Sequence, residues 1–249
     1  MTHHSATTRL LKPAGGTSVA ELTLSSAPRR WARLSESFLG VACTLACPPT
    51  RSFACWLAMG GGPILGGRGD ARSGLPRRET WSSLRGRDPA ELEHQLSTTF
   101  ARLFAGQPPA IELVESRFRA LTHPGLPGLT SALRRRRVRE LQEDQAAARF
   151  TPLSGTKEPD HLAVELHFLA HLLDGAVRHS QDGTTHLQRA AHVAQDHVIS
   201  WLPSMRAALR ARGEQGFFFA CMVVAEAAAH AVVEEAAALD SRTAPRGRR

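Results

Sequence analysis

Apolar residues recur at the spacing of an α-helix along most of this chain, and this period constrains the fold more than any other feature. The clearest case is KEPDHLAVELHFLAHLLDGA at residues 157–176, where leucines fall on one narrow stripe of a helix. No stretch alternates apolar and polar residues over a useful length, and the valine and isoleucine runs of strands are missing. The pattern predicts an all-α fold. The stripe residues are Leu162, Leu166, Leu169 and Leu173.

The chain has 249 residues, which is enough for one large helical domain with extended ends. We expect a flexible basic leader at residues 1–28, a single helical bundle at 29–240 with a glycine-rich loop at about 60–78, and a basic tail at 241–249. The glycine-rich loop lacks the Gly-Lys-Ser/Thr of a phosphate-binding loop. The predicted helices span residues 31–46, 53–59, 89–105, a short stretch before 121, 129–148, 159–176, 185–200, 203–213 and 217–239.

The net charge of +8 would suit an anionic partner such as nucleic acid. Much of the excess lies in the region before residue 90, in the arginines at 134–137 and in the tail SRTAPRGRR. A nucleic-acid module more typically interleaves arginines with aromatic residues along one folded face, and here the aromatic residues lie elsewhere. We therefore expect no nucleic-acid partner, and keep a basic helical nucleic-acid binder as an alternative.

Membrane insertion and export are not expected from the apolar pattern. We find no apolar stretch of the ~18 residues that a membrane-spanning helix needs. Arg29 and Arg30 precede a short apolar run, but no small-residue cleavage site follows it, so an amphipathic helix is favoured over an export signal. The cysteines match none of the common zinc or iron–sulfur spacings, and free thiols fit a cytoplasmic location.

Histidines and acids surround the leucine stripe of residues 157–176. Pro159 suits the first position of a helix, with Glu158 and Asp160 at the positive end of the helix dipole. His161 and Glu165 are four residues apart on a flank beside the stripe, and His167 and His171 are four residues apart on the face that points away from it. The two pairs therefore cannot bind one ion from a single straight helix. The sequence predicts no metal site. The flank holds His161, Glu165, Phe168 and Leu172; the outer face holds His167, His171 and Asp174.

His161 and Glu165 should be partly desolvated on that flank, and buried polar groups need partners. The partners could belong to the same fold or to a bound ligand. A histidine and a glutamate could also act as base and acid, which leaves a metal-dependent hydrolase as a further alternative. However, no nucleophile motif such as Gly-x-Ser-x-Gly is present, so we predict that the chain is not an enzyme.

Four segments together resemble one known family. EPDHLAVELHFLAHLL is similar to the Glu-Pro-x-Asp-His region of the TorD/DmsD/NarJ chaperones, and FARLFAGQPPAIELVESRF to their aromatic-x-x-Leu-Phe helix and following Glu-Ser. DHVISWLPSMRAAL resembles the His-x-x-x-Trp-x-Pro segment, and GFFFACMVVAEAAA the last helix of the family. The resemblance covers roughly residues 90 to 239, in the order of the family. Residues 1 to 80 match it poorly, and the family's usual tyrosine and glycine near RELQEDQAAARF are missing.

The resemblance implies a cytoplasmic, non-catalytic chaperone with no cofactor of its own, monomeric or homodimeric. Such a protein binds the twin-arginine leader and the apo form of a molybdopterin-containing oxidoreductase, assists insertion of the cofactor and delays export. Carboxylates beside an apolar groove would suit a leader that offers guanidinium groups and then an apolar run. Carried over onto this chain, the implied binding residues are Glu158, Pro159, Asp160, His161, Glu165, Phe168, His197 and Trp201.

Overall fold

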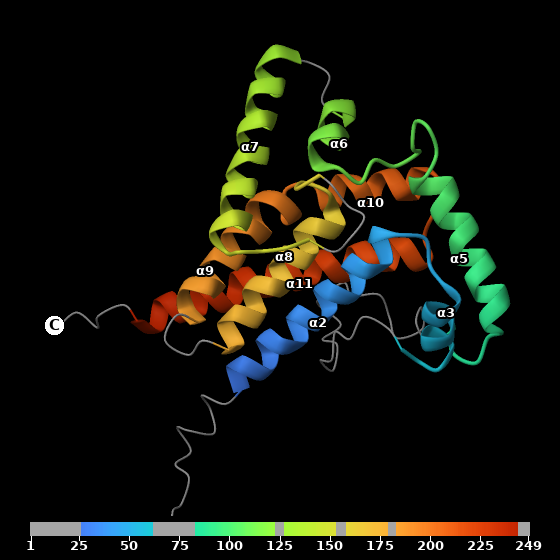
Figure 1. The fold of residues 1–249 in the computed structure, drawn as a ribbon, viewed down its shortest axis with the longest axis horizontal. Helices are drawn as coiled ribbons and strands as arrows, with labels where there is room; N and C mark the ends of the chain where they lie inside the picture. The colour runs from blue at the N-terminus through green and yellow to red at the C-terminus, as the bar shows by residue number, and fades with distance from the viewer. Residues whose placement is uncertain (1–25, 62–82, 123–126, 153–157, 179–182, 244–249) are drawn as a thin grey trace, which may run out of the picture.

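The computed structural model describes residues 26–61, 83–122, 127–152, 158–178 and 183–243, and their regular structure is helical apart from one isolated bridge (Figure 1). The all-α prediction is confirmed. The predicted leader up to residue 25, most of the glycine-rich loop and the end of the tail lie outside the described residues. The helices are α2 (Ser26–Ala46), α3 (Arg51–Ala58), α5 (Pro89–Phe104), α6 (Glu115–Thr122), α7 (Pro127–Ala147), α8 (Leu162–Arg178), α9 (Gly183–Val193), the π-helical turn η1 (Ala194–Ile199), α10 (Leu202–Ala211) and α11 (Phe217–Thr243).

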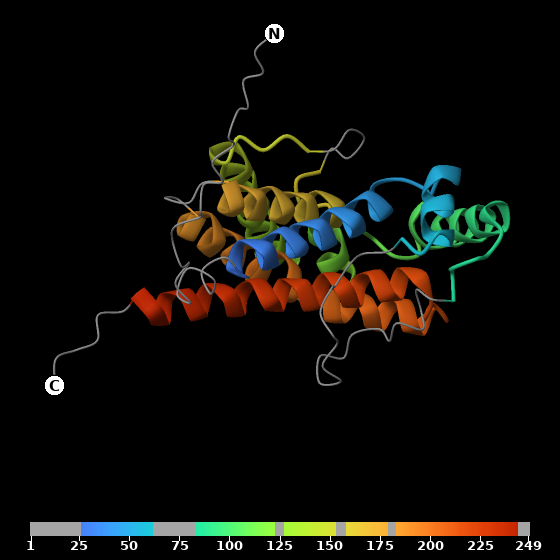
Figure 2. The same ribbon diagram turned by 90° about the horizontal axis from the view of Figure 1, so that it is seen from below.

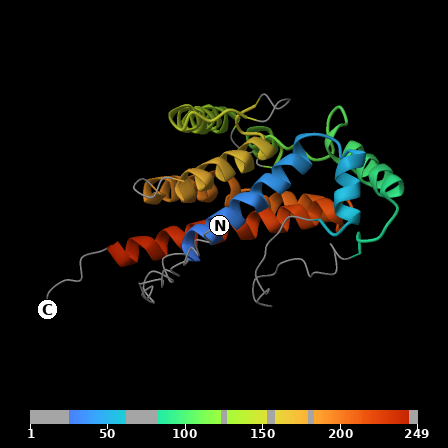
Figure 3. The same ribbon diagram turned by 60° about the horizontal axis from the view of Figure 1, so that its bottom comes forward.

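Three long helices form the body of the molecule. α11 runs along one side, and α2 and α8 cross over it, with α2 packed against both (Figure 2). α9 and η1 contact α8 and α11, and α7 lies on the far side of α8 and α9 from α11 (Figure 3). The leucine stripe of α8 is fully buried in this layered core, as its spacing predicted.

α3 and α5 pack together at one end of the molecule (Figure 1). α5 begins as expected, because the Asp88 carboxylate accepts hydrogen bonds from the backbone N–H groups of Ala90 and Glu91 at 2.6 and 3.2 Å. Pro89 follows in the first helical turn, where its missing N–H costs nothing. The predicted apolar stripe of α5 is buried and joins the common core: Leu92, Leu96, Phe100 and Leu103.

α11 corrects one expectation from the sequence. Its Phe217–Arg242 segment is long and apolar enough to cross a membrane by length and composition, with a mean hydropathy of 1.7. In the structure 61% of the most apolar 18-residue stretch of this segment is buried inside the protein. A central core helix is apolar on most of its faces for the same reason as a membrane helix, since little of either meets water. The composition of α11 is therefore weak evidence for insertion.

The start of α8 also differs from the prediction. Pro159 does not open the helix; residues 158–161 form a turn and one antiparallel bridge, between His161 and Val114, and α8 begins at Leu162. Two backbone hydrogen bonds hold this pairing, from Glu115 N to Asp160 O at 2.9 Å and from Leu162 N to Leu113 O at 2.8 Å. The local preference of proline for a first helical position is overridden by a contact with a distant segment.

Candidate functional site

The bridge brings the start of α6 against the start of α8, and polar side chains gather where these elements meet η1. Asp160, only 4% exposed, accepts a hydrogen bond from the backbone N–H of Ser116 at 3.0 Å through Oδ2. Its carboxylate therefore caps the first turn of α6, whereas the sequence had suggested that it lies at the start of α8. The charge of Asp160 stabilises the positive end of a neighbouring helix.

His161 caps α8. Its Nδ1 accepts a hydrogen bond from the backbone N–H of Ala163 at 3.1 Å, which requires the neutral ring with its proton on Nε2. Burial lowers the pKa of His161, and the charge of Arg117 acts in the same direction; the nearby Glu158 and Asp160 oppose them and lose. A hydrolase built on His161 and Glu165 would need the two to act together, whereas His161 Nδ1 is used by the cap and Glu165 converges with Glu115 and His197.

Glu115, the first residue of α6, is a buried carboxylate with several partners. Oε1 accepts from Arg119 Nε at 2.6 Å and from Arg137 Nη1 at 3.4 Å, and Oε2 lies 3.1 Å from His197 Nδ1. Burial alone would raise the pKa of Glu115, but the hydrogen bond from His197 and the charge of Arg119 outweigh it, so the pKa is lowered. Glu115 is therefore a carboxylate held in its ionised form.

Glu165 lies in the first turn of α8 and is completely buried, at 0% exposure. Neither of its oxygens makes a hydrogen bond of normal geometry among the described residues, although the Glu115 carboxylate and the Trp201 indole lie close enough to affect its charge. Burial raises the pKa of Glu165 well above its usual value, and the negative charges of Glu115 and Asp160 raise it further. The two neighbouring glutamates thus differ sharply, since one is ionised by its partners and the other is driven toward the neutral form.

His197 is 5% exposed and stands on the π-helical turn η1, which the sequence did not predict. The indole N–H of Trp201 donates a hydrogen bond to the backbone carbonyl of His197, so it satisfies a carbonyl near the end of the turn. The Trp201 ring packs on Phe118 of α6 with ring centroids 5.5 Å apart. This packing joins α6 to η1 and fixes the position of His197 beside Glu115.

An apolar groove lined by Phe168, Leu172 and Trp201 is not present. The three side chains are buried in the core, with Phe168 and Leu172 on α8 and Trp201 between η1 and α10. The sequence placed Phe168 and Leu172 on a flank of α8 correctly, but that flank faces the protein and not solvent. The helical spacing of Phe168 and Leu172 shows that they share an apolar face, but not whether that face packs in the core or binds a ligand.

Glu158 and Pro159 mark the accessible edge of this region. The Glu158 carboxylate is 40% exposed and accepts a hydrogen bond from Arg117 Nη2 of α6 at 2.8 Å. The Pro159 carbonyl accepts a hydrogen bond from Gln145 Nε2 of α7 at 3.2 Å. Of the carboxylates predicted to bind a partner, Glu158 alone is substantially exposed.

The outer histidines of α8 are half-buried, whereas the sequence suggested that they are exposed. The Phe150 ring packs against His167 and His171, with centroids 4.8 and 5.5 Å away. His171 Nε2 also lies 3.1 Å from the Ala148 carbonyl oxygen. The segment that follows α7 therefore covers the face of α8 that was expected to meet water.

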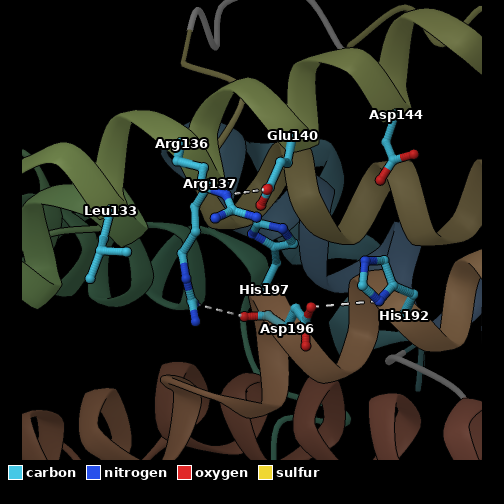
Figure 4. A pocket seen from close by; sticks show the side chains of 8 residues that line it. All are labelled: Leu133, Arg136, Arg137, Glu140, Asp144, His192, Asp196 and His197. Atoms are coloured by element: carbon cyan, nitrogen blue, oxygen red, sulfur yellow. Dashed lines mark hydrogen bonds and ion pairs between the residues drawn. The ribbon is translucent and has the colours of Figure 1, made fainter.

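A surface hollow of about 190 Å³ opens beside the buried cluster, between α7 and the α9–η1 segment (Figure 4). Side chains from both sides face one another across it, and His197 lies at its base. A smaller crevice, lined by Glu115 and Asp160, shares Arg137 with this hollow. Arg137 thus stands between solvent and the buried cluster. The hollow is lined by Leu133, Arg136, Arg137, Glu140, Asp144, His192, Asp196 and His197.

The arginine run of α7 is largely engaged within the fold. Arg134 donates to the Ser116 carbonyl at 3.3 Å, Arg136 pairs with Glu140 at 2.7 Å, and Arg137 donates to the Asp196 carbonyl at 3.2 Å as well as to Glu115. A nucleic-acid surface would need these groups to face phosphates. No contact in the described part of the chain favours that alternative over an internal role.

These features define a helical protein in which buried polar side chains tie α6, α8 and η1 together. The family model of the nitrate reductase delta subunit matches residues 74–207, more than half of the chain, and the chain belongs to this family. It is a family of molybdoenzyme maturation chaperones without catalytic activity, which confirms the resemblance to the TorD/NarJ proteins. No curated protein and no solved structure matched the chain.

The structure adds Glu115, Arg119 and Arg137 to the residues of the site. Glu115 lies in the segment VESRF, which the resemblance had marked without giving it a role. The two arginines carried no such signal, because nothing in their spacing shows that they turn inward. Among the residues predicted from the sequence, the structure brings Glu165 and His197 together and leaves Glu158 apart at the surface.

Proposed function

We propose that this chain binds the twin-arginine leader and the apo form of a molybdopterin-containing oxidoreductase, assists insertion of the cofactor and delays export. Its membership of a family of molybdoenzyme maturation chaperones is the observation that carries the proposal. A chaperone of this type would act in the cytoplasm, as a monomer or a homodimer. Catalytic turnover is not part of the proposal.

The surface around Glu158 is the proposed contact for the leader. A guanidinium group of the leader would replace Arg117 on the Glu158 carboxylate, since the present pair is exposed and therefore exchanges at little cost. Leu121 lies one turn beyond Arg117 on α6 and is 73% exposed, so an apolar segment following the arginines has a side chain to cover. Pro159 and His161 flank this surface and are half-buried.

The buried members of the predicted set serve this surface indirectly in the proposal. Asp160 and His161 cap α6 and α8, and thereby fix the turn that carries Glu158. Glu165, Phe168, His197 and Trp201 hold the same two helices from inside. Their substitution would change leader binding through the position of the turn, whereas substitution of Glu158 would change it by direct contact.

The test is a titration of a synthetic twin-arginine leader peptide and of an apo catalytic subunit against the wild type and Glu158→Gln. An exposed ion pair contributes about 0.2–1 kcal/mol, so the leader should bind up to about fivefold more weakly to the variant. Glu140→Gln is the matched control, because Glu140 is also an exposed partner of an arginine, and it should bind as the wild type does. A peptide with both arginines replaced by lysine should bind more weakly to the wild type.

Two outcomes would count against the proposal. Absence of binding by both the peptide and the apo subunit would overturn the function. Equal binding by the wild type, Glu158→Gln and Glu140→Gln would keep the function but remove Glu158 from the contact surface.

A further inference from the structure

Glu115, Glu165 and His197 form a compact set of ligand-type side chains. Each can offer one oxygen or nitrogen atom, and these three atoms lie within 4.8 Å of one another. All three residues are buried, and they come from α6, α8 and η1 respectively. Their convergence therefore depends on the tertiary fold and could not be inferred from spacing along one helix.

Within this set, the Glu165 carboxyl lacks the hydrogen bonds that the other two side chains make. The other buried carboxylates at the head of α8 have donors: Asp160 has the Ser116 N–H, and Glu115 has Arg119. Glu165 is buried with no hydrogen bond of normal geometry in the described chain, although its carboxylate lies beside Glu115, His197 and Trp201. Buried polar groups in native proteins are nearly always satisfied, so such an exception needs an explanation.

We propose that Glu115 Oε2, one carboxylate oxygen of Glu165 and His197 Nδ1 bind a single divalent transition-metal ion, for which Zn²⁺ is the probe. Imidazole nitrogen and carboxylate oxygen are both ordinary ligands of such ions, and catalytic-type zinc sites take three protein ligands and leave a fourth position open. Glu115 Oε2 and His197 Nδ1 are 3.1 Å apart, close to the roughly 3.3 Å that separates two ligands around a tetrahedral ion. The fourth position would remain for water.

The surrounding contacts match those of a metal site. Arg119 holds Oε1 of Glu115 at 2.6 Å and leaves Oε2 facing His197, and ligating carboxylates are commonly oriented by such outer hydrogen bonds. His197 stands on a π-helical turn, a feature often found at functional sites. The charges of Arg119 and Arg137 oppose a cation, and the nearby carboxylate of Asp160 offsets part of that opposition.

An ion can reach the cluster from the surface. His197 lines the hollow between α7 and η1, and Glu115 lines the adjoining crevice, with Arg137 common to both (Figure 4). The Arg137 side chain is 44% exposed, and its contact with Glu115 is long at 3.4 Å. Movement of this one side chain would open the path. The proposed site is independent of the leader-binding function and would not require a reaction.

The test uses the full-length chain without an affinity tag, dialysed against EDTA and then against Zn²⁺. We expect one zinc ion per chain by mass spectrometry, and a rise in melting temperature when Zn²⁺ is added. Glu165→Gln should lower the affinity at least about tenfold in competition with a coloured chelator and abolish the thermal shift. Circular dichroism of the metal-free variant would show whether it folds, and Co²⁺ absorption of the wild type gives a second readout that needs no variant.

Two matched histidine variants serve as controls. His192→Gln removes an exposed histidine from the same hollow, and His171→Gln removes one of the paired histidines of α8; both should bind zinc as the wild type does. The proposal is overturned if the wild type holds no zinc, in which case a proton on Glu165 satisfies the cluster. It is also overturned if Glu165→Gln binds zinc as tightly as the wild type, and loss of binding in His171→Gln would then place the ion on α8 instead.

Discussion

The two parts of α8 are held in the protein by different forces. From Leu166 onward the helix packs against α2 through apolar side chains, with few polar links such as the hydrogen bond from Ser35 Oγ to the Ala170 carbonyl at 3.1 Å. Its first turn carries the buried Glu165 and the cap His161, and meets Glu115 and His197. One part resembles an ordinary core, whereas the other keeps polar groups out of water.

The apolar and polar parts of α8 also differ in what they contribute to the free energy of folding. Apolar packing is favourable in proportion to the area buried and tolerates changes that keep volume. Buried charged groups cost desolvation energy that is recovered only with good partners, and Glu165 has none in the described residues. The caps Asp160 and His161 are explained by stability, whereas the buried Glu165 carboxyl is not, and the proposed metal site would give it a binding role.

The largest effect is expected in the apolar part. Phe168→Ala should lower the free energy of unfolding by about 3–5 kcal/mol, because the ring is completely buried and packs on Phe150 with centroids 5.1 Å apart. Urea unfolding followed by circular dichroism measures the change. Val177→Ala, at an exposed position of the same helix, should change stability by less than about 0.5 kcal/mol. A loss below about 1 kcal/mol for Phe168→Ala would show that the ring is not part of the core.

A smaller loss is expected at the cap of α6. Asp160→Ala should cost about 1–3 kcal/mol, because it leaves the Ser116 N–H without its acceptor. Asp160→Asn keeps an acceptor oxygen and should recover most of the loss. Thermal unfolding of the two variants side by side measures the difference. Equal destabilisation by both substitutions would show that the charge of Asp160, and not its hydrogen bond, supports α6.

The cap of α8 should make stability depend on pH. Because the pKa of His161 is lowered by burial below its ordinary value of 6.5, the unfolded chain takes up the proton first as pH falls. The contribution of the neutral ring is present above 6.5 and is lost below it, since protonated Nδ1 cannot accept from Ala163 N–H. His161→Ala should cost about 1 kcal/mol at neutral pH, whereas His161→Asn should retain the cap.

The measurement is urea unfolding of the wild type and both variants at several pH values between neutral and mildly acidic. The wild type should lose stability relative to His161→Asn as pH falls, because asparagine caps without titrating. A constant difference across the series would contradict the neutral cap.

The smallest effect is expected at the surface. Glu158→Gln should change the free energy of unfolding by less than about 0.5 kcal/mol, since its pair with Arg117 is exposed. Chemical denaturation at two salt concentrations measures this. A loss above about 1 kcal/mol would show that Glu158 stabilises the fold. Weaker leader binding by Glu158→Gln could then no longer be assigned to the loss of a direct contact.

The sequence was sufficient for the helices and for the core stripe of α8, because local apolar period determines both. It misplaced Pro159 as the helix start, since the bridge between Val114 and His161 depends on a segment far away in the chain. For the same reason it paired Glu165 with His161, whereas the structure pairs it with Glu115 and His197. Helical spacing describes which residues share a face, but not what another element brings to that face.

The stability of Glu165→Met tests most directly whether the buried carboxyl of Glu165 serves binding and does not stabilise the fold. Methionine has a similar length and removes the buried carboxyl that lacks partners. In EDTA at pH 7.5 the account predicts a free energy of unfolding equal to that of the wild type or higher by about 1–4 kcal/mol. A loss of more than about 2 kcal/mol would contradict it, because Glu165 would then be a stabilising part of the core.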